Sequence, residues 1–107
     1  MSKLQQVSTA DFENEVLHAD VPVLVDFYAS WCMPCRMLAP VLEKMATEFE
    51  GKAKILKVDV DQDPQLAAAH QIQGVPTLKI FNAGRVEETV VGLLPPQTLK
   101  AKLESVA

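Results

Sequence analysis

The sequence predicts an α/β domain in which a central mixed five-stranded β-sheet is flanked by four α-helices on both faces. Two observations predict it: strand-length apolar runs alternate with segments of helical period, and the last two strands are separated by a short turn that fits a hairpin. Strand–helix–strand order gives parallel strands and a hairpin gives antiparallel ones, so the sheet is expected to be mixed. The 107 residues, 49% of them hydrophobic, are expected to form one domain over residues 1–107.

The first half of the chain contributes two strands and two helices to this prediction. Residues 4–7 are expected to form an edge strand, and Ser8 to begin a helix with Asp11 in a box-like capping position. Residues 21–29 are almost continuously apolar, as in a strand buried on both faces, and Asp26 is the exception. Residues 33–49 have helical period, with an expected kink at Pro40. Their apolar stripe consists of Met37, Leu38, Val41, Leu42, Met45 and Phe49.

The second half contributes three strands and two helices. Residues 54–60 form a strand, after which Asp63 is expected to cap a short helix with Pro64 at its first position. Residues 77–81 and 86–91 form the hairpin. A last helix begins at Pro95-Pro96 and carries Leu99, Leu103 and Val106 on one face.

Charge and cysteine content exclude several classes of protein. The net charge of −4 disfavours nucleic acid and anionic membrane as partners, and no apolar run approaches the length of a membrane span. Residues 1–6 lack the apolar stretch of a signal peptide, and only two cysteines are present. We therefore expect a cytoplasmic protein, with an organellar stroma or matrix as the alternative if a leader has been removed.

The two cysteines lie where the buried strand ends and a helix begins. Cys32 is expected near the N-cap and Cys35 one turn further on. Residues three apart on a helix have Cβ atoms roughly 5–6 Å apart, close enough for a disulfide. Unpaired N–H groups and the helix dipole stabilise a thiolate at Cys32. Cys32 is therefore the predicted nucleophile of thiol–disulfide exchange, and Cys35 the predicted resolving thiol.

A Cys-x-x-Cys pair also fits half of a zinc site or two inert core cysteines. Zinc needs four ligands, and the only other soft candidates, His18 and His70, are not in paired spacing. The flanking Trp31 and Pro34 at a strand-to-helix junction favour redox chemistry over both alternatives, so no metal is expected.

Asp26 interrupts the apolar strand six residues before Cys32. Buried acids are rare unless they are paired or functional, and burial raises a carboxyl pKa. Asp26 is therefore predicted to accept the proton of Cys35, directly or through water, with Lys57 as its partner. The alternative is a structural aspartate that caps a turn or only pairs with Lys57.

An ordered set of motifs resembles the thioredoxin family along essentially the whole chain. The motifs are Asp26-Phe27-Tyr28-Ala29, Trp31-Cys32-x-Pro34-Cys35, Pro40, Lys57-Val58-Asp59 with Asp61, Gly74-Val75-Pro76-Thr77 and Val91-Gly92. The resemblance implies a protein-disulfide reductase that donates electrons in cell redox homeostasis through a Cys32–Cys35 disulfide. It also implies that no cofactor is bound, and that a cis peptide bond precedes Pro76, which faces the cysteine pair.

The resemblance further implies partners and a docking surface. The partners are disulfide-containing substrate proteins and a thioredoxin reductase, expected to be an NADPH-dependent flavoprotein, and the chain itself is expected to be a monomer. The docking surface comprises Trp31, Pro34, Gly74, Val75, Pro76, Val91 and Gly92. Ordinary strand-end packing is an equal alternative for its valines and glycines. A non-catalytic binding module is the second candidate function, and it predicts that Cys32→Ser retains function.

Two positions depart from the family pattern. Members usually have Gly where this chain has Met33, and many have Trp where it has Tyr28. Met33, Pro34 and Lys57 are expected to tune the reduction potential. The sulfur of Cys32 is expected to be exposed, and the Met33 side chain is expected to lie beside it. The reduction potential that is typical of the thioredoxin family is about −270 mV, at the reducing end of the range for dithiol proteins. We expect a potential nearer to this value than to the roughly −120 mV of strong dithiol oxidants.

Overall fold

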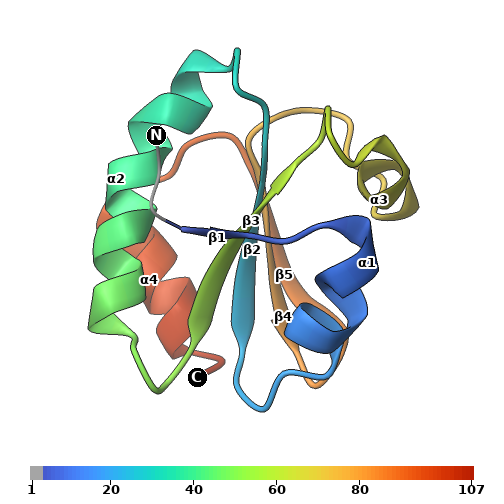
Figure 1. The fold of residues 1–107 in the computed structure, drawn as a ribbon. Helices are drawn as coiled ribbons and strands as arrows, with labels where there is room; N and C mark the ends of the chain where they lie inside the picture. The colour runs from blue at the N-terminus through green and yellow to red at the C-terminus, as the bar shows by residue number, and fades with distance from the viewer. Residues whose placement is uncertain (1–3) are drawn as a thin grey trace.

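The computed structural model describes residues 4–107 and confirms the predicted mixed five-stranded sheet (Figure 1). Residues 1–3, which belong to the segment expected to lack a signal-peptide pattern, lie outside the described part. The strand order is β1-β3-β2-β4-β5, with β1, β3 and β2 parallel and with β4 antiparallel to both β2 and β5. The strands are β1 Gln5–Gln6, β2 Val23–Tyr28, β3 Lys54–Asp59, β4 Thr77–Asn82 and β5 Arg85–Val91.

Helices cover both faces of the sheet, as predicted. In Figure 1, α2 and α4 lie against one face, and α1 and α3 lie on the other. The helices are α1 Thr9–Phe12, continued by the π-helical segment Glu13–Leu17, then α2 Met33–Glu48, α3 Pro64–Ala69 and α4 Pro96–Glu104. Helix α2 continues through Pro40. Within residues 4–107 no helix combines the length and apolar character needed to cross a membrane.

The alternation of side chains along β2 decides what lies beneath α2. Val23, Val25 and Phe27 join the apolar cluster under α1 and α3, whereas Leu24 joins the cluster under α2 and α4. Successive side chains of a strand point to opposite faces, so Asp26 lies on the same face as Leu24. On β3, Ile55 likewise belongs to the α2 cluster, which places Lys57 on that face too. The sheet therefore buries an acid and a base beneath α2.

Both predicted N-cap positions are confirmed, because Ser8 precedes α1 and Asp63 precedes α3, but neither side chain caps the backbone of its own helix. The Ser8 hydroxyl donates to Asp11 Oδ2 at 3.2 Å and caps no backbone N–H. Asp63 is the N-cap residue of α3, with Pro64 in the first turn as predicted, but its Oδ1 accepts hydrogen bonds from the N–H and the hydroxyl of Thr9, both at 2.9 Å. The fold brings the loop before α3 against the start of α1, so a carboxylate distant in sequence replaces the local cap.

Met37 was expected in the buried stripe of α2, but its side chain is 61% exposed. The core-facing positions are Leu38, Leu42 and Met45, spaced by four and three residues. Met37 is one residue, and so about a quarter turn, away from Leu38, which places it at the edge of the stripe.

The hairpin between β4 and β5 turns through Ala83 and Gly84. Both residues have positive φ, 53° and 81°, as a two-residue type I′ loop requires. A Cβ at Gly84 would lie 3.2 Å from the carbonyl oxygen of Leu17, so glycine also provides room for the π-helical segment.

Candidate active site at the start of helix α2

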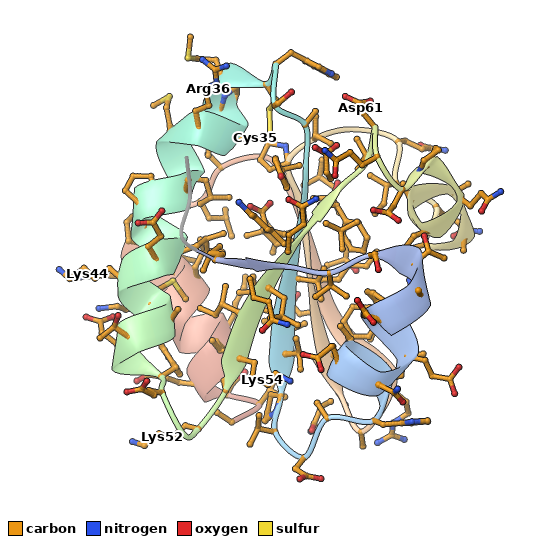
Figure 2. All side chains as sticks on the ribbon, viewed as in Figure 1. Cys35, Arg36, Lys44, Lys52, Lys54 and Asp61 are labelled. Carbon is orange, nitrogen blue, oxygen red and sulfur yellow. A yellow bond between two sulfur atoms is a disulfide. The ribbon has the colours of Figure 1, made fainter. Side chains whose placement is uncertain are left out.

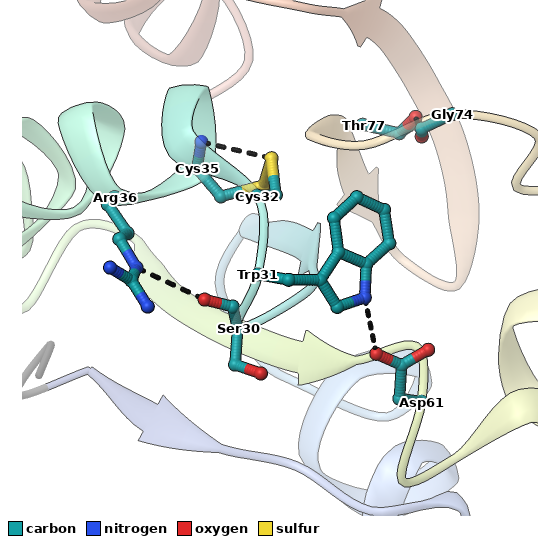
Figure 3. The surroundings of a disulfide bond; sticks show 8 residues. All are labelled: Ser30, Trp31, Cys32, Cys35, Arg36, Asp61, Gly74 and Thr77. Carbon is teal, nitrogen blue, oxygen red and sulfur yellow. Dashed lines mark hydrogen bonds between the residues drawn. A yellow bond between two sulfur atoms is a disulfide. The ribbon is translucent and has the colours of Figure 1, made fainter.

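The two cysteines form a disulfide at the first turn of α2 (Figure 3). Cys32 is the N-cap residue, with extended backbone (φ −88°, ψ 113°), and Pro34 follows in the first turn. The Cα atoms of Cys32 and Cys35 are 5.2 Å apart, and the N–H of Cys35 donates to Cys32 Sγ at 3.2 Å. A helix N-terminus thus directs an amide at this sulfur, as the sequence predicted.

The cysteine pair is less accessible than expected. Cys32 and Cys35 are each 4% exposed in this disulfide form, so the expectation of an exposed sulfur beside Met33 is wrong. The pair packs with Tyr28 and Ala29 at the end of β2, and Val60 and Val75 pack against this cluster from two other segments. These neighbours come from distant parts of the chain, which is why the helix pattern alone could not predict the cover.

Asp26 is buried beneath this helix, 4% exposed. Within residues 4–107 its Oδ1 has no hydrogen-bond partner. Burial raises the pKa of Asp26 to about 7, and the positive charge of Lys57 opposes that rise. Asp26 and Lys57 are direct neighbours in the β2–β3 register. The raised pKa agrees with the sequence analysis, and Lys57 lies next to Asp26 in the sheet as a charge that opposes the rise.

Asp26, Lys57 and Cys35 line the same pocket of about 510 Å³. Arg36 and Glu43 of α2 line it too. This pocket, which contains polar as well as apolar side chains, has room for water molecules, which need only about 10–15 Å³ each for their centres. The pocket therefore leaves space for water next to both Cys35 and Asp26.

Trp31 is held beside the disulfide by a partner that the sequence analysis did not assign. The indole is 69% exposed, and its Nε1 donates to Asp61 Oδ2 at 2.8 Å (Figure 3). Asp59 Oδ1 in turn accepts the N–H groups of Asp61 and Gln62 at 2.8 and 3.2 Å. An aspartate at a strand end followed by polar residues is a signal for such an Asx-type turn, and this signal could have identified Asp59.

The segment before β4 lies across from the cysteines. The Val75–Pro76 peptide bond is cis, as the resemblance implied. The Thr77 hydroxyl donates to the Gly74 carbonyl at 2.6 Å, and the N–H of Gly92 donates to the Pro76 carbonyl at 2.9 Å. The structure therefore brings the Gly74–Pro76 loop and the Val91-Gly92 end of β5 together, with Val75 against the cysteine pair.

The remaining members of the predicted set lie on two segments, the start of α2 and the end of β5. Met33 is 63% exposed, and Pro34 is exposed too. Val91 is 69% exposed. These side chains and Trp31 leave an apolar rim around a nearly covered disulfide.

The two histidines lie in other environments. His18 is paired with Glu13 at 3.6 Å, and the ring of His70 packs against Phe12, Phe27 and Phe81 with centroid distances of 4.9–5.7 Å. Among the described residues, no three His, Cys, Asp or Glu side chains are grouped to hold a metal ion.

Comparisons with known proteins agree with this geometry. The thioredoxin family model matches residues 3–105. Thioredoxin 1 of Nostoc sp. is 50% identical over 104 residues, covering 97% of both chains. The thioredoxins of Synechocystis sp. and Pseudomonas aeruginosa are 46% identical over 104 residues and 44% identical over 99, covering 97% and 92% of each chain.

Members of this family are protein-disulfide reductases that need no cofactor, because an active-site disulfide carries the electrons. The Cys-x-x-Cys pair of this chain stands at disulfide distance at a helix start, where such chemistry requires it. The match covers nearly the whole chain. The chain therefore belongs to the thioredoxin family and is a thiol–disulfide oxidoreductase.

Proposed function

We propose that Cys32 is the nucleophile of this reductase and that Cys35 resolves the mixed disulfide. The Cys32 thiolate attacks one sulfur of a substrate disulfide, and the other substrate sulfur leaves as a thiolate. The Cys35 thiolate then attacks Cys32 Sγ and releases the second substrate sulfur. Two electrons pass to the substrate, and the Cys32–Cys35 disulfide forms. The observation that carries this assignment is the position of Cys32 Sγ at the N-cap of α2, where it accepts the N–H of Cys35.

Asp26 is the proposed proton acceptor for Cys35. A base works best when its pKa lies near the working pH, and burial raises the pKa of Asp26 to about 7. Its Oδ1 has no hydrogen-bond partner within residues 4–107, and the shared pocket leaves space for a bridging water. We assign Lys57 the role of keeping this pKa from rising further.

Substrates are proposed to bind in extended form along the Gly74–Pro76 loop. Among residues 4–107 neither the N–H nor the C=O of Val75 has a hydrogen-bond partner, so both are available to an added strand. Trp31, Pro34, Val91 and Gly92 complete the docking surface, with Gly74 leaving open space beside it. The proposed reductant is a thioredoxin reductase, an NADPH-dependent flavoprotein. The small number of cysteines supports a reducing compartment, for which we propose the cytoplasm.

Cysteine variants test the two sulfur roles. Insulin disulfides serve as substrate, with a dithiol as electron donor. Cys32→Ser is expected to lose reduction completely, and Cys35→Ser to accumulate a covalent mixed disulfide through Cys32 that is visible by mass spectrometry. A trapped adduct on Cys35 in the Cys32→Ser protein, and none on Cys32 in the other variant, would reverse the assignment.

The midpoint potential tests the direction of electron flow. We expect a value near the reducing end, about −270 mV, where the couple reduces most protein disulfides. A measured potential above about −200 mV would place the protein among oxidants or isomerases instead.

A further inference from the structure

The three methionines within residues 4–107 fall into two different environments. Met45 is 1% exposed in the core under α2, whereas Met33 and Met37 are 63% and 61% exposed. Met33 and Met37 are four residues apart on α2, so they lie on the same side of the helix, one turn from each other. Met33 directly follows Cys32. Two accessible thioethers therefore stand beside the reactive disulfide.

Met33 and Met37 belong to a larger group of exposed apolar side chains near the cysteine pair. The described residues include six large apolar side chains that are markedly exposed: Trp31, Met33, Met37, Val86, Val91 and Leu93. Five of the six lie on two segments next to the cysteines. Trp31, Met33 and Met37 lie at or near the start of α2, and Val91 and Leu93 lie at or just after the end of β5. Exposed apolar side chains gathered in this way indicate a contact surface. Met33 and Met37 extend the docking surface along α2.

A thioether in this position is open to oxidation. A hydroperoxide transfers one oxygen atom to the sulfur: the O–O bond breaks, an S–O bond forms, the sulfur loses two electrons and the peroxide is reduced to water or an alcohol. The product is a polar, chiral sulfoxide in place of a flexible apolar side chain. The cysteines are protected while they are joined as a disulfide, because peroxide attacks the thiolate.

We propose that Met33 and Met37 form an oxidation-sensitive site, at which hydroperoxides convert the apolar extension of the docking surface into a polar one. Sulfoxide formation there weakens the binding of protein disulfides far more than it changes the reaction with a small disulfide, which does not need the docking surface. The consequence for binding rests on the proposed function, whereas the selectivity of oxidation does not.

The positions of lysine and arginine allow this selectivity to be measured directly. Cleavage by trypsin after Lys3, Arg36, Lys44 and Lys52 separates the four methionines into four peptides: Met1–Lys3, Leu4–Arg36, Met37–Lys44 and Met45–Lys52. The disulfide form is treated with hydrogen peroxide and digested, and added oxygen is followed by mass spectrometry. The Met33 and Met37 peptides are expected to gain one oxygen atom each well before the Met45 peptide. Equal rates for the Met37 and Met45 peptides would overturn the proposal.

The peptide Leu4–Arg36 also contains Trp31 and both cysteines, so Met33→Leu is the matched control. Leucine is apolar, similar in size and cannot form a sulfoxide. The oxygen on this peptide is expected to be absent from the treated Met33→Leu protein. If the variant gains it at the wild-type rate, the oxygen is on another side chain and Met33 is not the site.

The effect on function is measured after the disulfide has been reduced with dithiothreitol. KM and kcat are determined for insulin and for a small aromatic disulfide, before and after peroxide treatment, in the wild type and in the Met33→Leu/Met37→Leu variant. Each protein is compared only with itself. In the wild type we expect the KM for insulin to rise about tenfold, the scale of losing part of one methionine's burial, with little change for the small disulfide.

The outcomes separate this inference from the proposed function. The inference is overturned if peroxide treatment leaves the KM of the wild type for insulin unchanged. It is also overturned if the treatment raises the KM of the Met33→Leu/Met37→Leu variant as much as that of the wild type. An untreated protein that does not reduce insulin at all contradicts the proposed function instead.

Discussion

Two neighbouring strands each bury an aspartate near the cysteine pair, and the two carboxylates differ in their hydrogen bonds. Asp26 of β2 is 4% exposed and Asp59 of β3 is 6% exposed. Asp59 Oδ1 accepts two backbone N–H groups, from Asp61 and Gln62. Asp26 Oδ1 accepts none within residues 4–107, and burial raises the pKa of Asp26 to about 7.

The difference separates a structural carboxylate, Asp59, from the carboxylate that we propose as a proton acceptor, Asp26. Asp59 compensates its desolvation with hydrogen bonds, and through the turn that it closes it positions Asp61, the partner of Trp31. Asp26 Oδ1 has no such hydrogen bond within residues 4–107, and burial raises the pKa of Asp26 to about 7. Burial of an acid is therefore not by itself evidence of function; the hydrogen bonds around it distinguish the two cases.

Asp26→Asn is expected to have the largest effect on stability. The folded pKa of about 7 lies above the ordinary value of 3.8, so the folded state holds its proton more tightly. Protonated Asp26 therefore contributes stability that is fully present below about pH 4, and this contribution is lost as the pH rises through about 7. At pH 8 we expect the variant to be more stable by roughly 2–4 kcal/mol, measured by denaturant unfolding.

The same measurement at pH 4 is the control for this prediction. There Asp26 is protonated in the folded wild type, and the stability advantage of the variant should nearly disappear. A gain that is independent of pH would mean that charge burial is not its cause. A less stable variant at pH 8 would show that Asp26, like Asp59, is a structural acid.

Asp59→Ala is expected to lower the free energy of unfolding by about 2 kcal/mol, because the N–H groups of Asp61 and Gln62 after β3 lose their acceptor. The turn would loosen, and with it the Asp61–Trp31 hydrogen bond. Denaturant unfolding measures the loss, and Trp31, the only tryptophan, reports the local change by fluorescence. Asp59→Asn, which keeps an acceptor oxygen, is the matched control and should lose less. An unchanged stability of Asp59→Ala would remove the contrast with Asp26.

Lys57→Met tests whether the charge on β3 holds the pKa of Asp26 down. Because the Lys57 charge lowers that pKa, its removal should raise the pKa of Asp26 above 7, a change on the order of 1–2 kcal/mol between the protonation states. The Asp26 carboxyl can be titrated by carbon NMR. The optimum pH for resolving the mixed disulfide should move upward with it. A lower pKa in the variant would contradict the pairing.

Asp63→Ala is expected to have the smallest effect, about 1 kcal/mol of lost stability, from the cap that Asp63 provides for α1. Asp63 is only partly buried, so it extends the comparison to a hydrogen-bonded acid outside the core. Thermal unfolding measures the change, and Thr9→Val should remove only the hydroxyl part of the contact. A loss larger than that of Asp59→Ala would contradict the ranking by burial.

The sequence was sufficient for the architecture and for the cysteine pair. Strand-length apolar runs and the hairpin turn are local signals, and Cys32 at a helix start depends only on where β2 ends. Asp26 was predictable because a charge inside an apolar strand is conspicuous. The cis bond at Pro76 came from the family resemblance and not from spacing.

The features that could not be predicted depend on contacts between distant segments. The cap of α1 comes from Asp63, and the cover of the disulfide comes from Val60 and Val75. Helical period also could not distinguish a buried Leu38 from an exposed Met37, since both are apolar and adjacent in the chain. These outcomes are decided by how the layers meet, which the local pattern does not specify.

The active-site cysteines lie at only one end of the sheet, beyond the last residues of the central strands β2 and β3. Cys35, Arg36 and Asp61 lie at one end of the molecule, and Lys52 and Lys54 lie at the other (Figure 2). The connections before β2 and β3 and the Ala83-Gly84 turn share that second end, since Val23 is in register with both Lys54 and Phe81. Insertions, affinity tags or circularly permuted termini placed in these three loops would therefore lie a full strand length from the sulfur atoms, which makes them the natural places for evolution or engineering to lengthen the chain.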